Sequence, residues 1–122
     1  MKTVVIVDDE FGLADTLAVT LADVGFRALT AADGIRGLEV MREQPPDLVI
    51  LDYMMPRLDG PGVLAAMATD PKLASVPVIM ITAMSESAVA KRCTGYVSFL
   101  RKPFTFEAVL DAVERAIGRS RT

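Results

Sequence analysis

Length, composition and charge exclude several classes of protein. The 122 residues fit one domain, and a hydrophobic content of 52% is sufficient for a buried core. The net charge of −3 argues against direct nucleic-acid binding, which usually needs a basic face, and no apolar run approaches the roughly 20 residues that span a bilayer. Cys93 is the single cysteine, which excludes an internal disulfide and favours a reducing cytoplasm. The absence of histidine excludes histidine-based catalysis and most zinc sites.

Five apolar, β-branched runs along the chain have the length of β-strands. They are residues 3–7, 27–31, 48–51, 76–81 and 96–100. Four of these runs are continuously apolar instead of alternating, which is typical of strands that are covered on both faces of a parallel sheet.

Segments with helical spacing of apolar residues separate these runs. The predicted buried faces are Ala14, Leu17, Ala18 and Leu21; Ile35, Leu38 and Met41; Val63, Leu64 and Met67; and Phe106, Val109, Leu110, Val113 and Ile117. Thr105 is placed to cap the last helix, and Gly25 to end the first. The alternation of strands and helices predicts an α/β fold with a doubly wound five-stranded parallel sheet and helices on both faces.

The fourth helix is the weakest of the predicted elements. Only residues 85–92 are available for it, and their apolar spacing is poor. We therefore expect a shortened fourth helix. The domain is expected to extend over residues 1–118, with a polar tail at residues 119–122.

Polar side chains stand at the ends of four predicted strands. They are Asp8, Asp9 and Glu10 after the first run, Asp52 after the third, Thr82 after the fourth and Lys102 after the fifth. Because the carboxyl ends of parallel strands meet at one edge of the sheet, where ligands bind, these side chains should converge. Clustered carboxylates repel one another unless a cation lies among them, and Mg²⁺ prefers such oxygen ligands.

This set of groups fits the chemistry of phosphoryl transfer. A carboxylate beside Mg²⁺, here Asp52, can attack phosphorus and form an acyl phosphate. Lys102 supplies positive charge for the phosphoryl oxygens, and Thr82 supplies a hydrogen-bond donor. Each residue alone also has a structural explanation, as a helix cap, a turn residue, a strand residue or a solvated lysine. The agreement of four separate strand ends favours the functional interpretation.

Several motifs occur together in a specific order and spacing. They are residues 4–10 (VVIVDDE), 46–52 (PDLVILD), Met55-Pro56, Asp59-Gly60, Ile81-Thr82-Ala83 and Lys102-Pro103-Phe104. With these motifs the chain closely resembles, over nearly its whole length, the CheY-like receiver domain of two-component response regulators, which has a flavodoxin-like fold.

The resemblance implies roles for individual residues. Asp52 would be the phosphorylated residue, Asp9 would bind Mg²⁺ directly, and Asp8 would do so through water. The backbone carbonyl of Met54 would be a further ligand of the metal, with Asp52 itself.

The remaining roles concern the phosphoryl group and its consequences. Thr82 and Lys102 would bind the phosphoryl group, and Phe99 occupies the position of an aromatic switch residue. The Lys102-Pro103 peptide bond is expected to be cis. The donor would be a histidine kinase or a histidine phosphotransfer protein. The surface of the fourth helix, fifth strand and fifth helix would bind an unknown protein partner, in the cytoplasm of a bacterium, without direct contact with nucleic acid.

Two departures from the family pattern affect these expectations. The segment from Thr82 to Gly95 is shorter than usual, and the loss falls in the fourth helix. Methionine stands two residues beyond Asp52 and two beyond Thr82, at positions that are often polar in the family and tune the lifetime of the phosphoryl group.

Three other functions remain open from the sequence. A phosphohydrolase of the haloacid-dehalogenase type would need an Asp at the position of Met54, so the chain is expected to be a phosphoacceptor and not a turnover enzyme. A flavodoxin-like flavin binder would need a phosphate-binding loop where Asp8, Asp9 and Glu10 stand. A degenerate receiver that acts without phosphorylation would be expected to lack part of the acidic, Thr and Lys set.

Overall fold

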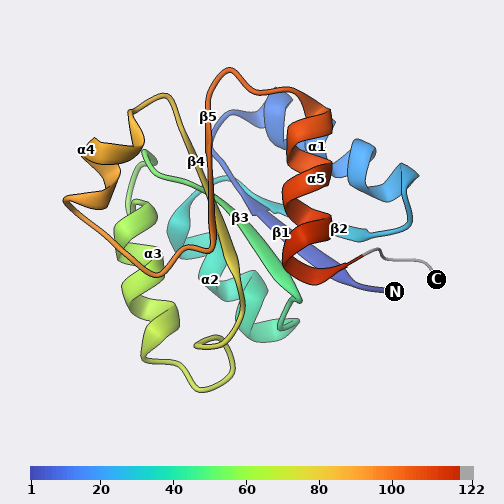
Figure 1. The fold of residues 1–122 in the computed structure, drawn as a ribbon. Helices are drawn as coiled ribbons and strands as arrows, with labels where there is room; N and C mark the ends of the chain where they lie inside the picture. The colour runs from blue at the N-terminus through green and yellow to red at the C-terminus, as the bar shows by residue number, and fades with distance from the viewer. Residues whose placement is uncertain (119–122) are drawn as a thin grey trace.

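The computed structural model describes residues 1–118, so the polar tail expected at 119–122 lies outside the described residues (Figure 1). Strands and helices alternate as predicted. They are β1 (Thr3–Val7), α1 (Phe11–Asp23), β2 (Arg27–Ala31), α2 (Gly34–Glu43), β3 (Leu48–Asp52), α3 (Gly60–Ala68), β4 (Val78–Thr82), α4 (Glu86–Ala90), β5 (Ser98–Arg101) and α5 (Phe106–Ile117).

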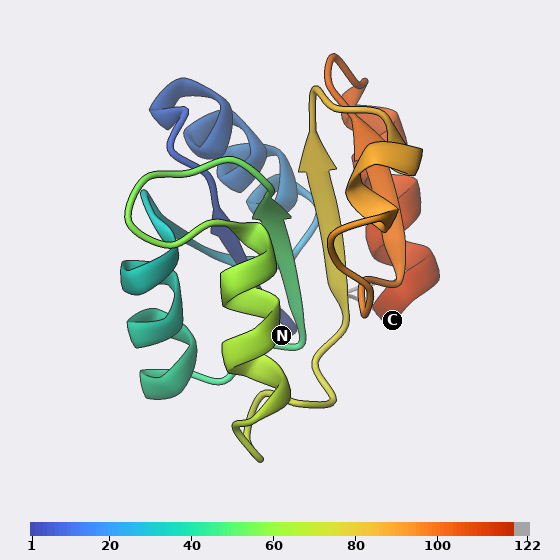
Figure 2. The same cartoon turned by 90° about the vertical axis from the view of Figure 1, so that its left-hand side faces the viewer.

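The strands form one parallel sheet in the order β2-β1-β3-β4-β5, with helices on both faces. Figures 1 and 2 show α1 and α5 on one face and α2, α3 and α4 on the other. Two apolar clusters fill the space between the layers, one on each face. The predicted doubly wound α/β fold is confirmed, and β3 lies at the centre of the sheet.

The three central strands are the most deeply buried. Every residue of β3 and β4 is buried, and so is all of β1 beyond Thr3, which explains their continuous apolar sequences. β4 begins later than predicted because Pro77 has no N–H to donate and the N–H of Val76 instead binds the carbonyl of Leu73. β5 also begins later than predicted, at Ser98, and none of its residues is fully buried.

The predicted apolar face of α2 is partly wrong. Ile35 is 48% exposed, whereas Gly34 and Gly37 are buried together with Leu38 and Met41. The helix lies so close to β1 that a Cβ atom on Gly37 would stand 2.8 Å from a methyl of Val7. Two glycines thus belong to the buried face, from which the predicted Ile35 is excluded. Phe106 on α5, 40% exposed, is similarly less buried than predicted.

Side-chain caps fix the starts of four helices. Asp33, Asp59, Ser85 and Thr105 accept hydrogen bonds from backbone N–H groups in the first turns of α2, α3, α4 and α5. The Thr105 cap was predicted, whereas the cap by Asp59 was not. The α1 helix ends at Asp23, shortly before Gly25, whose φ of 97° suits glycine.

The α4 helix is as short as predicted. It has five residues, Glu86–Ala90, and among them Val89 alone is fully buried. Two helical turns or fewer are marginal in isolation, so α4 depends on this contact and on its Ser85 cap.

None of the helices among residues 1–118 combines the length and the apolar character needed to cross a membrane.

Candidate functional site

The strand ends bring the predicted acidic residues together. Carboxylate oxygens of Asp8, Asp9 and Asp52 all lie within 4.8 Å of one another. Asp8 directly follows β1 and Asp52 ends β3, and these strands are neighbours in the sheet. Parallel pairing thus creates the cluster from residues that are more than forty positions apart in the chain.

Two of the three carboxylates in this cluster are buried. Asp8 is 1% exposed and Asp52 is 4% exposed, while Asp9 is exposed. Burial raises the pKa of the Asp52 carboxyl to about 7; the charge of Asp8 adds to this increase, and the charge of Lys102 opposes it. A cation bound among these carboxylates would favour the ionised form of Asp52.

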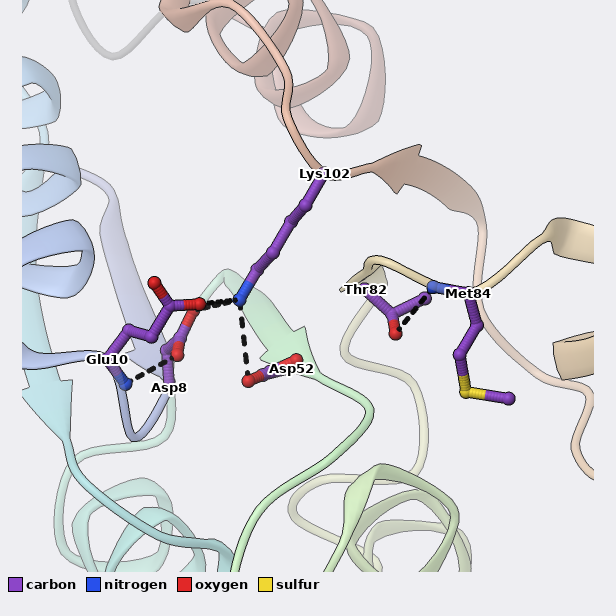
Figure 3. Close-up of polar contacts among 6 residues, drawn as sticks. All are labelled: Asp8, Glu10, Asp52, Thr82, Met84 and Lys102. Carbon is purple, nitrogen blue, oxygen red and sulfur yellow. Dashed lines mark hydrogen bonds and ion pairs between the residues drawn. The ribbon is translucent and has the colours of Figure 1, made fainter.

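Lys102 extends into the cluster from the end of β5. Its Nζ lies 2.7 Å from Glu10 Oε1, 3.2 Å from Asp8 Oδ2 and 3.6 Å from Asp52 Oδ2 (Figure 3). Burial alone would lower the pKa of Lys102, but the hydrogen bond to Glu10 and the charges of Asp52 and Asp8 raise it above its ordinary value. The Lys102-Pro103 bond is cis, as predicted.

Glu10 has a role that sequence reasoning did not identify. It was interpreted as part of the acidic run or as a cap of α1, but it makes no side-chain cap and instead makes the shortest contact with Lys102. The two residues are 92 positions apart, and no local pattern marks Glu10 as the partner of that lysine.

Thr82 lies beside the acidic cluster at the end of β4. Its side chain is buried, and its Oγ1 accepts a hydrogen bond from the N–H of Met84 at 3.2 Å (Figure 3). The hydroxyl therefore bonds to the first part of the β4–α4 loop through a lone pair and retains its hydrogen as a donor.

Phe99 lies apart from the carboxylates. It is half-buried on β5, pairs in register with Met80, and packs against the apolar cluster beneath α2, α3 and α4. Its ring is tilted against that of Tyr96, with centroids 6.1 Å apart. The structure thus connects Phe99 with the α4 side of the sheet and not directly with the acidic cluster.

A cleft of about 700 Å³ opens next to the cluster. It is lined by Asp9, Tyr53, Met54, Met55, Asp59, Met84 and Arg92. Met54 and Met84, the two departures from the family pattern, thus share the cleft, and Met54 is 63% exposed. Sequence reasoning did not identify Asp59 or Arg92 as residues of this region, and no motif marks Arg92.

The donor atoms fit a hard divalent cation. Three carboxylates within one small cluster are ligands that Mg²⁺ prefers, and exposure of Asp9 leaves room for the waters that Mg²⁺ retains. The thioether of Met54 is a soft group and does not suit this ion, so only the backbone carbonyl of this residue is a suitable ligand.

Comparisons with known proteins agree with this geometry. The family described as "Response regulator receiver domain" matches residues 4–114. A Rhizobium etli protein described as "Probable chemotaxis protein CheY" is 39% identical over 118 residues, which cover 94% of this chain and 92% of that protein. Other curated relatives are transcriptional regulators, and the chain spans about half of their length.

Solved structures show the same fold. Chemotaxis protein CheY4 of Vibrio cholerae has a TM-score of 0.89 at 28% identity, covering 95% of this chain and 98% of that one. The receiver domain of sensor histidine kinase PA1611 from Pseudomonas aeruginosa, described with a magnesium ion in its active-site cleft, has a TM-score of 0.88 at 25% identity, with 96% and 98% coverage. From its family match and its strand-end site, this chain belongs to the response regulator receiver domains.

Proposed function

We propose that this protein accepts a phosphoryl group on Asp52 in a Mg²⁺-dependent reaction, with a histidine kinase or a histidine phosphotransfer protein as the donor. The observation that carries the proposal is the arrangement around Asp52. Its carboxylate is buried, lies within 4.8 Å of those of Asp8 and Asp9, and has the Lys102 ammonium 3.6 Å away.

The proposed roles follow from this arrangement. Asp9, Asp8, Asp52 and the backbone carbonyl of Met54 would hold Mg²⁺, which neutralises charge on phosphoryl oxygens. Lys102 has three N–H donors, so it can exchange a carboxylate for a phosphoryl oxygen and remain hydrogen-bonded.

Thr82 would complete the phosphoryl site. Its hydroxyl keeps one donor hydrogen, and rotation of the side chain toward the phosphoryl group would break its bond with the Met84 N–H. Phosphorylation would thereby act on the β4–α4 loop first, since Met84 belongs to it.

The protein is proposed to be a phosphoacceptor and not a turnover enzyme. Repeated hydrolysis of phosphoesters needs a group that donates and accepts protons beside the nucleophile. The side chain two residues beyond Asp52 is that of Met54, which can do neither.

The test is a labelling experiment on the purified chain. With acetyl phosphate and Mg²⁺, intact mass should rise by one phosphoryl group, and the rise should disappear in Asp52→Ala and in the presence of EDTA. Asp59→Asn is a matched control, because it removes a carboxylate from the same cleft while asparagine still caps α3. Labelling that persists in Asp52→Ala would refute the proposed acceptor.

The proposed output is a change in the surface of α4, β5 and α5 that a downstream protein in the cytoplasm binds. Phe99 and Tyr96 pack together beneath this surface, so a shift of the β4–α4 loop would reach them directly. Hydrogen exchange over residues 83–95, with and without beryllofluoride and Mg²⁺, tests this output. Equal exchange in the two states would exclude the switch without affecting the phosphorylation chemistry.

A further inference from the structure

Two cations differ in their surroundings: Lys102 reaches the acceptor Asp52, and Arg92 lines the cleft beside the acidic cluster. Lys102 is engaged with Glu10, Asp8 and Asp52. Arg92 lines the cleft together with Asp9 and Met84, and within residues 1–118 it makes no ion pair. One wall of the cleft therefore holds an arginine whose guanidinium remains available to a ligand.

Arg92 lies two residues beyond the end of the short α4 helix. The helix ends at Ala90, and the N–H groups of Arg92 and Cys93 turn back to the carbonyl of Val89, at 2.9 and 3.0 Å.

The surroundings of Cys93, the next residue, agree with this position. Burial, followed by the negative charge of Asp59, raises the pKa of the Cys93 thiol. Asp59 lines the same cleft from the start of α3. Arg92, after α4, and Asp59, before α3, thus line the same cleft.

We propose that Arg92 binds the phosphoryl group of an incoming acyl phosphate and sets the affinity for such small-molecule donors. This inference rests on the proposed phosphorylation of Asp52. Asp9 and Asp59 in the cleft repel a phosphate dianion, and among the described residues that line the cleft Arg92 is the one cation. Guanidinium groups bind phosphate oxygens in a two-pronged manner that suits this task.

The reaction itself is a simple displacement. An oxygen of Asp52 forms a bond to phosphorus, the bond from phosphorus to the acyl oxygen breaks, and the carboxylate leaves with the bonding electron pair. Arg92 contacts only the oxygens that are not exchanged, so no proton or electron passes through it.

The proposal predicts different effects on the binding of the phosphoryl donor and of Mg²⁺. Removing the charge of Arg92 should weaken the binding of the anionic donor, but it should leave the affinity for Mg²⁺ unchanged or raise it, because a positive charge disappears near a cation site. If Arg92 only held the loop in place, its replacement would weaken the binding of both the donor and Mg²⁺, since a displaced loop would disturb the metal ligands as well.

The experiment uses acetyl phosphate as the donor and measures the labelling rate of Asp52 as a function of donor concentration. Arg92→Gln should raise the half-saturating concentration about tenfold, as expected for the loss of a hydrogen bond to a charged group. Arg92→Lys should recover most of this loss. Mg²⁺ affinity of the same variants is measured separately by calorimetry without donor.

Lys91→Gln is the matched control. Lys91 is the exposed neighbour of Arg92 and does not line the cleft. This variant therefore loses the same charge but keeps the proposed contact of Arg92 with the phosphoryl group. It should behave like the unmodified protein. Equal half-saturation in Arg92→Gln and Lys91→Gln, or weakening of Mg²⁺ together with the donor in Arg92→Gln, would overturn the inference while labelling of Asp52 persists. Failure of the unmodified protein to become labelled would refute the proposed function and this inference with it.

Discussion

The β3–α3 loop and the segment from the β4–α4 loop to β5 differ in how firmly they are held. The loop between β3 and α3 is packed against the start of α2, where a Cβ atom on Gly34 would stand 2.2 Å from the carbonyl oxygen of Leu58. Arg57 of this loop forms an ion pair with the buried Asp33 at 3.6 Å. The N–H of Gly60 closes the loop on the carbonyl of Tyr53, at 2.8 Å.

The opposite side, from the β4–α4 loop to β5, has little fully buried apolar surface. Its helix has five residues and one fully buried side chain, Val89, and β5 is only half-buried. Segments with few buried apolar groups open locally before the rest of a domain. The proposed metal ligand Met54 therefore lies on the firmly held side, whereas Thr82 and Phe99 adjoin the side that is free to rearrange.

The largest expected effect is on the rigid side. Gly34→Ala places a methyl group against the backbone of Leu58, and we expect it to lower the free energy of unfolding by about 3 kcal/mol. Gly95→Ala, on the loose side, meets no atom within 4 Å and is strained only by its φ of 101°, so it should cost about 1–2 kcal/mol. Urea denaturation measures both, and a larger loss for Gly95→Ala would reverse the comparison.

A matched pair of valines tests the same difference between the α3 side and the α4 side. Val63 in α3 and Val89 in α4 are both fully buried in the same cluster, so the change to Ala removes the same atoms from each. Val63→Ala should lower the free energy of global unfolding by about 2 kcal/mol. Val89→Ala should lower it less, because α4 opens before the domain unfolds, and should instead speed hydrogen exchange in residues 83–95. Equal global losses would show that α4 unfolds only with the whole domain.

A change of pH between about 6 and 8 should act on Asp52 and not on the α4 side. Since the pKa of Asp52 is about 7, Mg²⁺ competes with a proton there, and its affinity should be about tenfold lower at about pH 6 than at about pH 8. On the α4 side, the pKa values of Cys93 and Tyr96 are both raised, so both groups stay neutral over this range.

Without Mg²⁺, the stability of the fold should change with pH in the direction opposite to the change in Mg²⁺ affinity. The raised pKa of Asp52 stabilises the fold below its ordinary value of 3.8, and this contribution is lost as the pH rises through about 7. Calorimetric titration with Mg²⁺ and thermal denaturation in EDTA measure the two trends. An affinity for Mg²⁺ that is the same at both pH values would contradict the high pKa of Asp52.

The smallest expected effect concerns the two methionines, one on each side of the cleft. Met54 comes from the rigid side and Met84 from the loose side, and neither side chain can orient a water for attack on the acyl phosphate. Met54→Asn with Met84→Glu should therefore speed loss of the phosphoryl group severalfold, as followed by intact mass after donor removal. Met54→Leu with Met84→Leu is the apolar control and should not change the rate. Unchanged loss in the polar variant would show that the methionines do not shield the site.

The alternation of strands and helices, the shortened α4 and the acidic residues of the site could all be predicted from the sequence. Strand and helix periodicities are local, and parallel strands align their carboxyl ends, so residues such as Asp8 and Asp52 were predicted to meet. The tertiary structure alone decided that Glu10 pairs with Lys102, that Ile35 faces outward while Gly37 faces β1, and that Arg92 lines the cleft. The physical reason is that each of these outcomes depends on the distance between packed segments that are remote in the chain, and side-chain periodicity carries no information about that distance.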